Sequence, residues 1–299
     1  MNSKKFAIKA LILCGLLFIA DRGIGTLLEW MYFNQKGEDY YFTTKTLDEQ
    51  TCELVVLGSS RARNHYDPQI LEDSIGMSCY NAGRSGCFLV YQSAQLDMIL
   101  DRYIPRMIVL EVTPYDMDPG EGDYDRLSGL LPYQHHASFK KVIAKKSPWE
   151  QYKCWSRIYP YNSLCLKMVK NLKDRGEFRS NGYQPLGGEW NEPIGDYGTA
   201  EGPVDERKVS EMVHIMDVCK QKNIALVMVT SPMFARCKET RTLAITDSLC
   251  KERGIAYHSF LNNPAYEDGK LYSTSDHLNA AGAEMFSREI AHKLSNLTR

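Results

Sequence analysis

Residues 54–62 read LVVLGSSRA and decide the fold class of this 299-residue chain. Four apolar residues, two of them β-branched, end abruptly at Gly-Ser-Ser, and a segment typical of a helix follows. A short apolar run of this kind predicts a strand buried in a parallel sheet. Because α/β proteins keep their functional groups at the carboxyl edge of such a sheet, the pattern places the hydroxyl of Ser60 there.

The rest of the chain alternates predicted strands with predicted helices. Apolar runs predict further strands at 79–83, 107–112, 224–230 and 255–260. Amphipathic segments predict helices at 67–75, 87–103, 204–222, 237–253 and 279–295. Alternation at this spacing predicts a parallel sheet covered by helices on both faces, with right-handed crossovers.

The middle of the chain, about 117–203, breaks this rhythm and is rich in Tyr, Trp, Pro and Gly. An irregular insertion near the carboxyl edge of a sheet often shapes a substrate cleft, and aromatic faces among polar neighbours suit sugar rings. The alternative is that these aromatic residues form a small core within the insertion.

Composition excludes several classes of protein. The formal net charge of -1 gives no reason to expect nucleic acid as a partner. The nine cysteines include no Cys-x-x-Cys pair, so a zinc or redox site has little support, and we expect neither a metal nor a cofactor. Some cysteines can pair if the body is exported, and the alternative is that they are small buried apolar residues.

The N-terminal segment differs from the rest of the chain. Lys4, Lys5 and Lys9 precede or enter an apolar run at 10–20. The run is short against the roughly 20 residues of a usual bilayer span, but Lys9 can snorkel and residues 24–33 continue the apolar, aromatic character. The lysines predict a cytoplasmic N-terminus and a body outside the cytoplasm.

We therefore expect a membrane anchor at 1–33, a polar linker at 34–52 and a body at 53–299 that carries the insertion. A cleaved signal peptide is one alternative, which Phe18 weakens because it stands where a small residue is usual before the cleavage site. A buried or peripheral helix is the other alternative.

Ser60 needs a base to act as a nucleophile, because an isolated hydroxyl is barely ionised at neutral pH. His277 is the best candidate, since it lies just before the last predicted helix and follows a polar loop. His65 is closer in sequence, but it lies in a turn before a helix and fits a structural role better.

Backbone N–H groups at Ser60 and at the turn around Gly83 are candidate oxyanion donors, because glycine lets the backbone approach a developing negative charge. The alternative for Gly83 is a simple strand-to-helix turn. The Gly-x-Ser-x-Gly elbow of α/β-hydrolases is absent, since Ala62 stands in place of the second glycine.

Three blocks together resemble the SGNH/GDSL hydrolase family: GSS at 58–60, NAG at 81–83 and DHLNAAGA at 276–283. The resemblance covers about 54–116 and 205–295, and its style is that of membrane-anchored bacterial members linked to envelope polysaccharides. It implies a flavodoxin-like three-layer α/β/α sandwich with a parallel sheet, and an esterase, a lipase or an O-acyltransferase.

By this resemblance Ser60 is the nucleophile, His277 the base, and Gly83 and the Ser60 N–H are oxyanion donors. The family usually has an Asp three residues before the catalytic His, where this chain has Thr274. Asp276 adjoins His277, and neighbours in an extended turn tend to point apart. Asp276 reaches the ring only if the backbone bends; otherwise a carboxylate comes from elsewhere or a Ser-His dyad operates.

Other positions near the expected site carry weaker expectations. Tyr115 stands where the family has an oxyanion-binding Asn, and its hydroxyl can donate a hydrogen bond. Arg61 and Arg84, with Asn81, are candidates to bind an anionic sugar or carboxylate substrate. The alternative for the arginines is salt bridging to acidic residues of the neighbouring helix.

The sequence thus favours a single-pass protein of the bacterial inner membrane with its body in the periplasm. We expect an SGNH-type serine esterase or O-acyltransferase that acts on acyl esters, most simply acetyl esters, of a cell-surface glycan or small molecule. The alternative is a degenerate SGNH-like domain that binds glycan or a partner in polysaccharide assembly.

Overall fold

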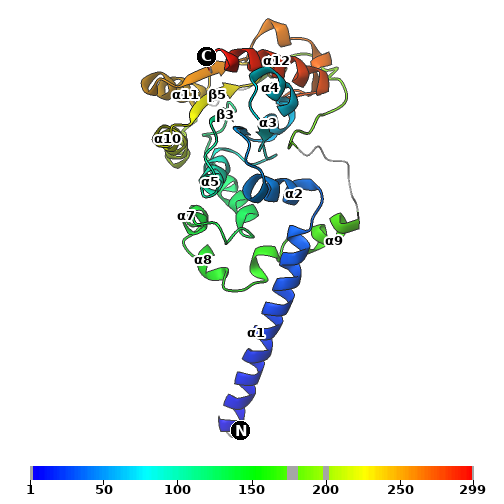
Figure 1. Ribbon diagram of the computed structural model, residues 1–299, viewed down its shortest axis with the longest axis vertical. Coiled ribbons are helices and arrows are strands. Elements are labelled where there is room, and N and C mark those ends of the chain that lie inside the picture. The colour runs from blue at the N-terminus through cyan, green and yellow to red at the C-terminus, as the bar shows by residue number, and fades with distance from the viewer. Residues whose placement is uncertain (1–2, 174–180, 198–201, 298–299) are drawn as a thin grey trace. The chain divides into compact units, whose positions relative to one another are not determined.

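The computed structural model of the protein describes residues 3–173, 181–197 and 202–297, and the chain divides into two compact units (Figure 1). Met1–Thr44 and Asp125–Glu177 belong to the first unit, and Lys45–Tyr124 and Phe178–Arg299 belong to the second. The N-terminal segment therefore shares a unit with part of the predicted insertion.

A five-stranded parallel sheet forms the centre of the second unit. Its strand order is β2-β1-β3-β5-β7, with bounds Cys79–Asn81, Leu54–Leu57, Met107–Glu111, Ala225–Thr230 and Ala256–Ser259. Counted along the chain, this is the flavodoxin-like order 2-1-3-4-5, whose topological switch point lies between β1 and β3. The predicted fold class, an α/β sandwich with a parallel sheet, is confirmed.

Helices cover both faces of this sheet (Figure 1). On one face α3 (Ser60–His65), α4 (Pro68–Ile75) and α12 (Ala280–Ser295) pack together, and α5 (Leu89–Leu100) packs with α10 (Glu206–Gln221). α11 (Arg241–Arg253) packs beside β7. The predicted strands and helices agree with these bounds to within a few residues.

Alternation along the strands divides the core between the two faces. Leu54 and Val56 of β1 lie in one apolar cluster with Phe286 and Ile290 of α12. Side chains alternate along a strand, so Val55 and its equivalents on neighbouring strands point to the opposite face. Every residue of β1 and β3 is buried, as a strand covered on both faces requires.

The remaining elements of the second unit are short. Two small sheets add to it: the parallel pair β4 (Gly195–Tyr197) with β6 (Ala235–Cys237), and the antiparallel hairpin of β8 (Tyr272–Thr274) with β9 (His277–Leu278). The other helical pieces are a π-helix at Lys45–Glu49, α6 at Gly122–Asp125, whose last residue belongs to the first unit, and 3₁₀ turns at Pro264–Tyr266 and Gly269–Leu271.

The first unit is built around a long N-terminal helix, α1 (Ser3–Phe33). The predicted linker contributes α2 (Glu38–Thr44), and the insertion contributes short elements at Arg126–Leu130, α7 (Phe139–Ala144), α8 (Glu150–Lys153), Tyr159–Tyr161 and α9 (Cys165–Lys173). The buried ring of Tyr32 contacts the rings of Tyr133 and Tyr161, so some aromatic residues of the insertion do form a small core.

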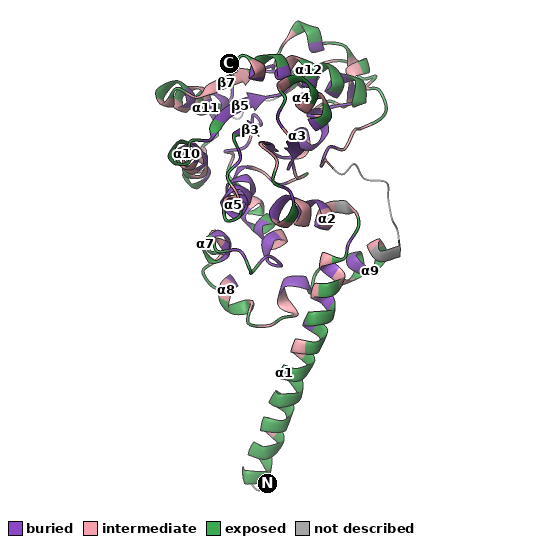
Figure 2. Ribbon diagram, in the orientation of Figure 1, coloured by how far each residue is buried: buried purple, intermediate pink, exposed green. Residues whose placement is uncertain are grey.

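Most of α1 is exposed, as Figure 2 shows. By length and composition it is long and apolar enough to cross a membrane. Its buried residues, Gly25, Leu28 and Tyr32, all lie in the second half of the helix.

Candidate active site

A tight turn after β1 delivers Ser60 to the carboxyl edge of the sheet. Gly58 has φ +149°, and a Cβ at this position would lie 2.7 Å from the Cβ atoms of both Ala62 and Glu111. Glycine is therefore required here. Ser60 opens α3 directly after this turn, next to the switch point of the sheet where ligands of such folds bind.

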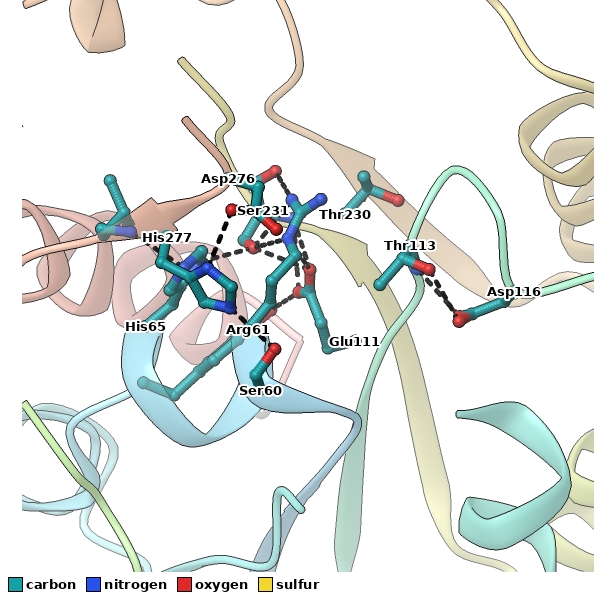
Figure 3. A network of polar contacts seen from close by, with 12 residues as sticks. Ser60, Arg61, His65, Glu111, Thr113, Asp116, Thr230, Ser231, Asp276 and His277 are labelled. Carbon is teal, nitrogen blue, oxygen red and sulfur yellow. Dashed lines mark hydrogen bonds and ion pairs between the residues drawn. The ribbon is translucent and has the colours of Figure 1, made fainter. Parts of the chain in front are cut away.

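Ser60, His277 and Asp276 form a continuous hydrogen-bonded chain (Figure 3). The Ser60 Oγ lies 2.7 Å from Nε2 of His277, and Nδ1 of His277 lies 2.9 Å from Oδ1 of Asp276. All three side chains are half-buried rather than sealed from solvent. The structure thus brings together the three residues that were predicted from the sequence to be catalytic.

The local backbone explains how Asp276 reaches its neighbour's ring. Asp276 lies in the two-residue turn between β8 and β9, and the hairpin register shifts between Tyr272 and Thr274, just before this turn. The side chains of Asp276 and His277 therefore converge instead of pointing apart. Thr274, at the end of β8, supports the pair: its Oγ1 lies 2.8 Å from Oδ1 of Asp276 and 3.0 Å from Nδ1 of His277.

Electrostatics fixes the direction of these hydrogen bonds. Burial alone would raise the pKa of the Asp276 carboxyl, but the hydrogen bond and charge of His277, the Thr274 hydroxyl and the charge of Arg61 together lower it to about 2. Asp276 is therefore ionised at neutral pH and can only accept hydrogen bonds. Neutral His277 then carries its proton on Nδ1 and leaves Nε2 as the acceptor for the Ser60 hydroxyl.

Arg61 does not meet the expectation of a substrate-binding residue. Its side chain is 0% exposed, and its Nε lies 3.2 Å from Oε1 of Glu111. The guanidinium also donates to the carbonyl and hydroxyl of Ser231. Burial raises the pKa of Glu111, which Arg61 and hydrogen bonds from Tyr66 and Ser231 oppose. Arg61 is thus part of a buried polar network beneath the site.

His65 connects this network to the candidate base. Its Nε2 accepts a hydrogen bond from the N–H of Leu278 at 3.0 Å, so its Nδ1 carries the proton and donates to the hydroxyl of Ser231 at 2.8 Å. Burial, Arg61 and His277 lower the pKa of His65 well below its usual range, which keeps the ring neutral. Because Leu278 follows His277, this bond fixes the strand that carries the base.

Asn81 and Gly83 have structural roles that differ from those expected. Asn81 is buried, its Nδ2 donates to the carbonyls of Ala62 and Tyr66, and its Oδ1 accepts the N–H of Gly83 at 2.9 Å. A Cβ on Gly83 would overlap the backbone N of Arg63. Asn81 therefore does not face a substrate, and the Gly83 N–H, expected as an oxyanion donor, is held by Asn81.

Tyr115 and Arg84 remain candidates. The ring of Tyr115 packs edge-on against Phe88 and lies 5.9 Å from the ring of Tyr197, between centroids. Burial raises the pKa of Tyr115, so its hydroxyl keeps the proton that it could donate. The guanidinium of Arg84 lies 5.7 Å from the ring centroid of Tyr91, and its backbone N–H donates to Gly58. Neither contact assigns these residues a role toward substrate.

Comparisons with known proteins add little. No family model matches the sequence, and no curated protein matches it. Among solved structures, one match is described as a "putative lipolytic protein of G-D-S-L family" from Desulfitobacterium hafniense DCB-2, with 10% sequence identity and a TM-score of 0.37. The match covers 80% of this chain and 98% of the other. A likeness at this level carries no conclusion about activity.

Proposed function

We propose that this chain is an SGNH-type serine ester hydrolase or O-acyltransferase. The observation that carries the proposal is the chain of contacts from Ser60 Oγ through His277 to Asp276, at 2.7 Å and 2.9 Å. A nucleophile, a base and an orienting carboxylate in this order are the parts that acyl transfer needs. Thr274 stands where the SGNH family usually has the orienting aspartate, but Asp276, directly before His277, supplies the carboxylate instead.

The proposed reaction proceeds through an acyl-enzyme. Ser60 Oγ attacks the acyl carbon of the ester while Nε2 of His277 takes the hydroxyl proton. The N–H of Ser60, in the first turn of α3 where helical N–H groups have no partner in their own helix, stabilises the oxyanion. Collapse breaks the ester bond, and His277 returns the proton to the leaving alcohol. Water or a sugar hydroxyl then takes the acyl group from Ser60 by the reverse steps.

The substrate and location form a finer part of the proposal. We infer that the acyl ester belongs to a cell-surface glycan and that α1 holds the protein in the inner membrane, with the second unit in the periplasm. The length and exposure of α1 support an anchor, and the lysines at its start support this orientation. A degenerate binding domain is less well supported, because Asp276 reaches His277.

Hydrolysis of a short-chain aryl acetate tests the proposal. The wild type is compared with Ser60→Ala and with the matched control Ser59→Ala. Ser59 is a suitable control because it is the neighbour of Ser60 in the sequence, whereas its own Oγ is buried and has no hydrogen-bond partner among the described residues. We expect Ser60→Ala to abolish turnover and Ser59→Ala to retain it. Equal rates for the wild type and Ser60→Ala would end the nucleophile assignment.

A further inference from the structure

The exposed apolar part of α1 ends at a defined level. Residues 3–20 are exposed along almost their whole length, with Leu11 72% and Ile19 67% exposed, and Asp21 and Arg22 follow. Residues 6–20 of this stretch contain one charged residue, Lys9, which can snorkel, and at 1.5 Å per residue they are about 23 Å long, against a hydrocarbon thickness of about 30 Å. If α1 spans the membrane, Asp21 and Arg22 mark the edge of the hydrocarbon region on the side of the body.

Hydrogen bonds fix a segment of the insertion at this same level. The Asp21 carboxylate accepts from the Ser156 hydroxyl and from the N–H of Arg157 at 3.0 Å, and Arg22 donates to the carbonyl of Trp155 at 2.7 Å. Gly25 lies so close to Arg157 that a Cβ would overlap it. Trp155 is therefore held beside the end of the apolar stretch.

Three aromatic side chains of this segment point away from the protein. Trp149, Tyr152 and Trp155 are 67%, 56% and 77% exposed, and the rings of Trp149 and Tyr152 lie 6.0 Å apart between centroids. Glu150, on the inward side, is buried and accepts hydrogen bonds from Lys153 at 2.7 Å and from the Tyr159 hydroxyl at 2.6 Å. These bonds hold the turn so that the aromatic side chains stay outside.

The same region is strongly basic. Residues 140–157 contain five lysines, one arginine and a single acidic residue, whereas the whole chain has a net charge of -1. Exposed Trp and Tyr side chains that are interleaved with basic residues suit the headgroup region of a bilayer, where an amphipathic ring has both an apolar and a wet neighbour. Basic residues there are attracted to anionic phospholipids.

We propose that residues 149–157, named the interface segment, lie in the headgroup region of the bilayer that α1 spans. Trp149, Tyr152 and Trp155 insert among the lipid headgroups and upper acyl chains, and the basic side chains of 140–157 bind anionic phospholipid. The segment thereby fixes the orientation of the first unit on the membrane surface. This inference rests on the proposed membrane placement of α1, but not on the chemistry of Ser60.

Depth-dependent fluorescence quenching in the full chain tests the proposal. The protein is reconstituted into vesicles of phosphatidylcholine and phosphatidylglycerol that carry a nitroxide on the lipid headgroup. One variant retains only Trp155 (W30F/W149F/W190F), and its matched control retains only Trp190, in the second unit (W30F/W149F/W155F). Flotation with the vesicles reports separately whether α1 has inserted.

We expect both variants to float with the vesicles, and the nitroxide to remove most of the Trp155 emission; the Trp190 variant reports the quenching of a tryptophan outside the first unit. Replacing phosphatidylglycerol with phosphatidylcholine should reduce the quenching of Trp155. Flotation with the same Trp155 emission in vesicles with and without the nitroxide would overturn the interface segment while leaving the anchor intact. Failure to float would overturn the membrane placement itself.

Discussion

Replacing Asp276 with asparagine removes the negative charge that faces Nδ1 of His277 at 2.9 Å. Loss of the orienting carboxylate costs about 10⁴-fold in kcat in a well-studied serine protease. A hydrogen bond to a charged group contributes about 1.5–3 kcal/mol, which corresponds to about 10- to 150-fold. Because the Asp276 side chain is 34% exposed and the Thr274 hydroxyl also lies 3.0 Å from Nδ1, we expect an intermediate loss, about 10²- to 10³-fold in kcat.

The assay is steady-state hydrolysis of an aryl acetate, with the matched double variant Thr274→Asp/Asp276→Asn. Oγ1 of Thr274 occupies a position from which a carboxylate could reach Nδ1, so the double variant should recover part of the lost kcat. KM should change little, because the carboxylate does not touch the substrate. Wild-type kcat in Asp276→Asn would refute the role of this carboxylate.

The other predictions concern stability and are checked by urea unfolding. Glu111→Gln leaves Arg61 as a buried, uncompensated charge, so we expect a loss of about 3–5 kcal/mol; an unchanged midpoint would contradict the buried ion pair. Gly83→Ala forces a Cβ against the backbone N of Arg63 and should cost about 1–3 kcal/mol, whereas a stabilised variant would contradict this close packing. Burial raises the pKa of Asp116 to about 7, so its contribution to stability is complete below about pH 4 and is lost as the pH rises through about 7. Asparagine does not titrate, so the free energy of unfolding of Asp116→Asn, relative to that of the wild type, should rise as the pH rises from about 4 to about 7. A difference between the two proteins that does not change with pH would contradict the raised pKa.

The sheet could be predicted from the sequence because its strands are buried on both faces. Continuous apolar runs such as 54–57 and 107–110 have few alternative conformations in a globular protein, and their alternation with helices leaves few topologies. A helical segment after Gly-Ser-Ser was expected, but the bounds of the short helix α3 were not predicted, because its polar residues 60–65 show no amphipathic period.

The environment of the site was harder to predict. Asp276 reaches His277 from a two-residue hairpin turn that follows an irregular strand, and its residues, Ser275 and Asp276, are not one of the pairs that mark such turns in a sequence. Arg61 was expected to bind substrate, whereas its side chain is buried against Glu111, and arginine is rarely buried in this way. One signal was available: Glu111 ends an otherwise apolar strand, and a buried carboxylate needs a buried cation.

Asn81 was misassigned for a related reason. A polar residue at a strand end can face a ligand or satisfy nearby backbone groups, and only tertiary structure distinguishes the two. Here the Asn81 amide joins the end of β2 to α3 by accepting from Gly83 and donating to Ala62 and Tyr66.

Covalent capture of Ser60 tests the central claim most directly. An alkyl fluorophosphonate reacts with a serine hydroxyl that an adjacent base activates, and mass spectrometry of the digested protein locates the adduct. The hydrogen bond from Ser60 to Nε2 of His277 predicts a single adduct on Ser60, retained in Ser59→Ala and absent from Ser60→Ala. An unlabelled wild-type protein, or an adduct on another residue, would contradict the account.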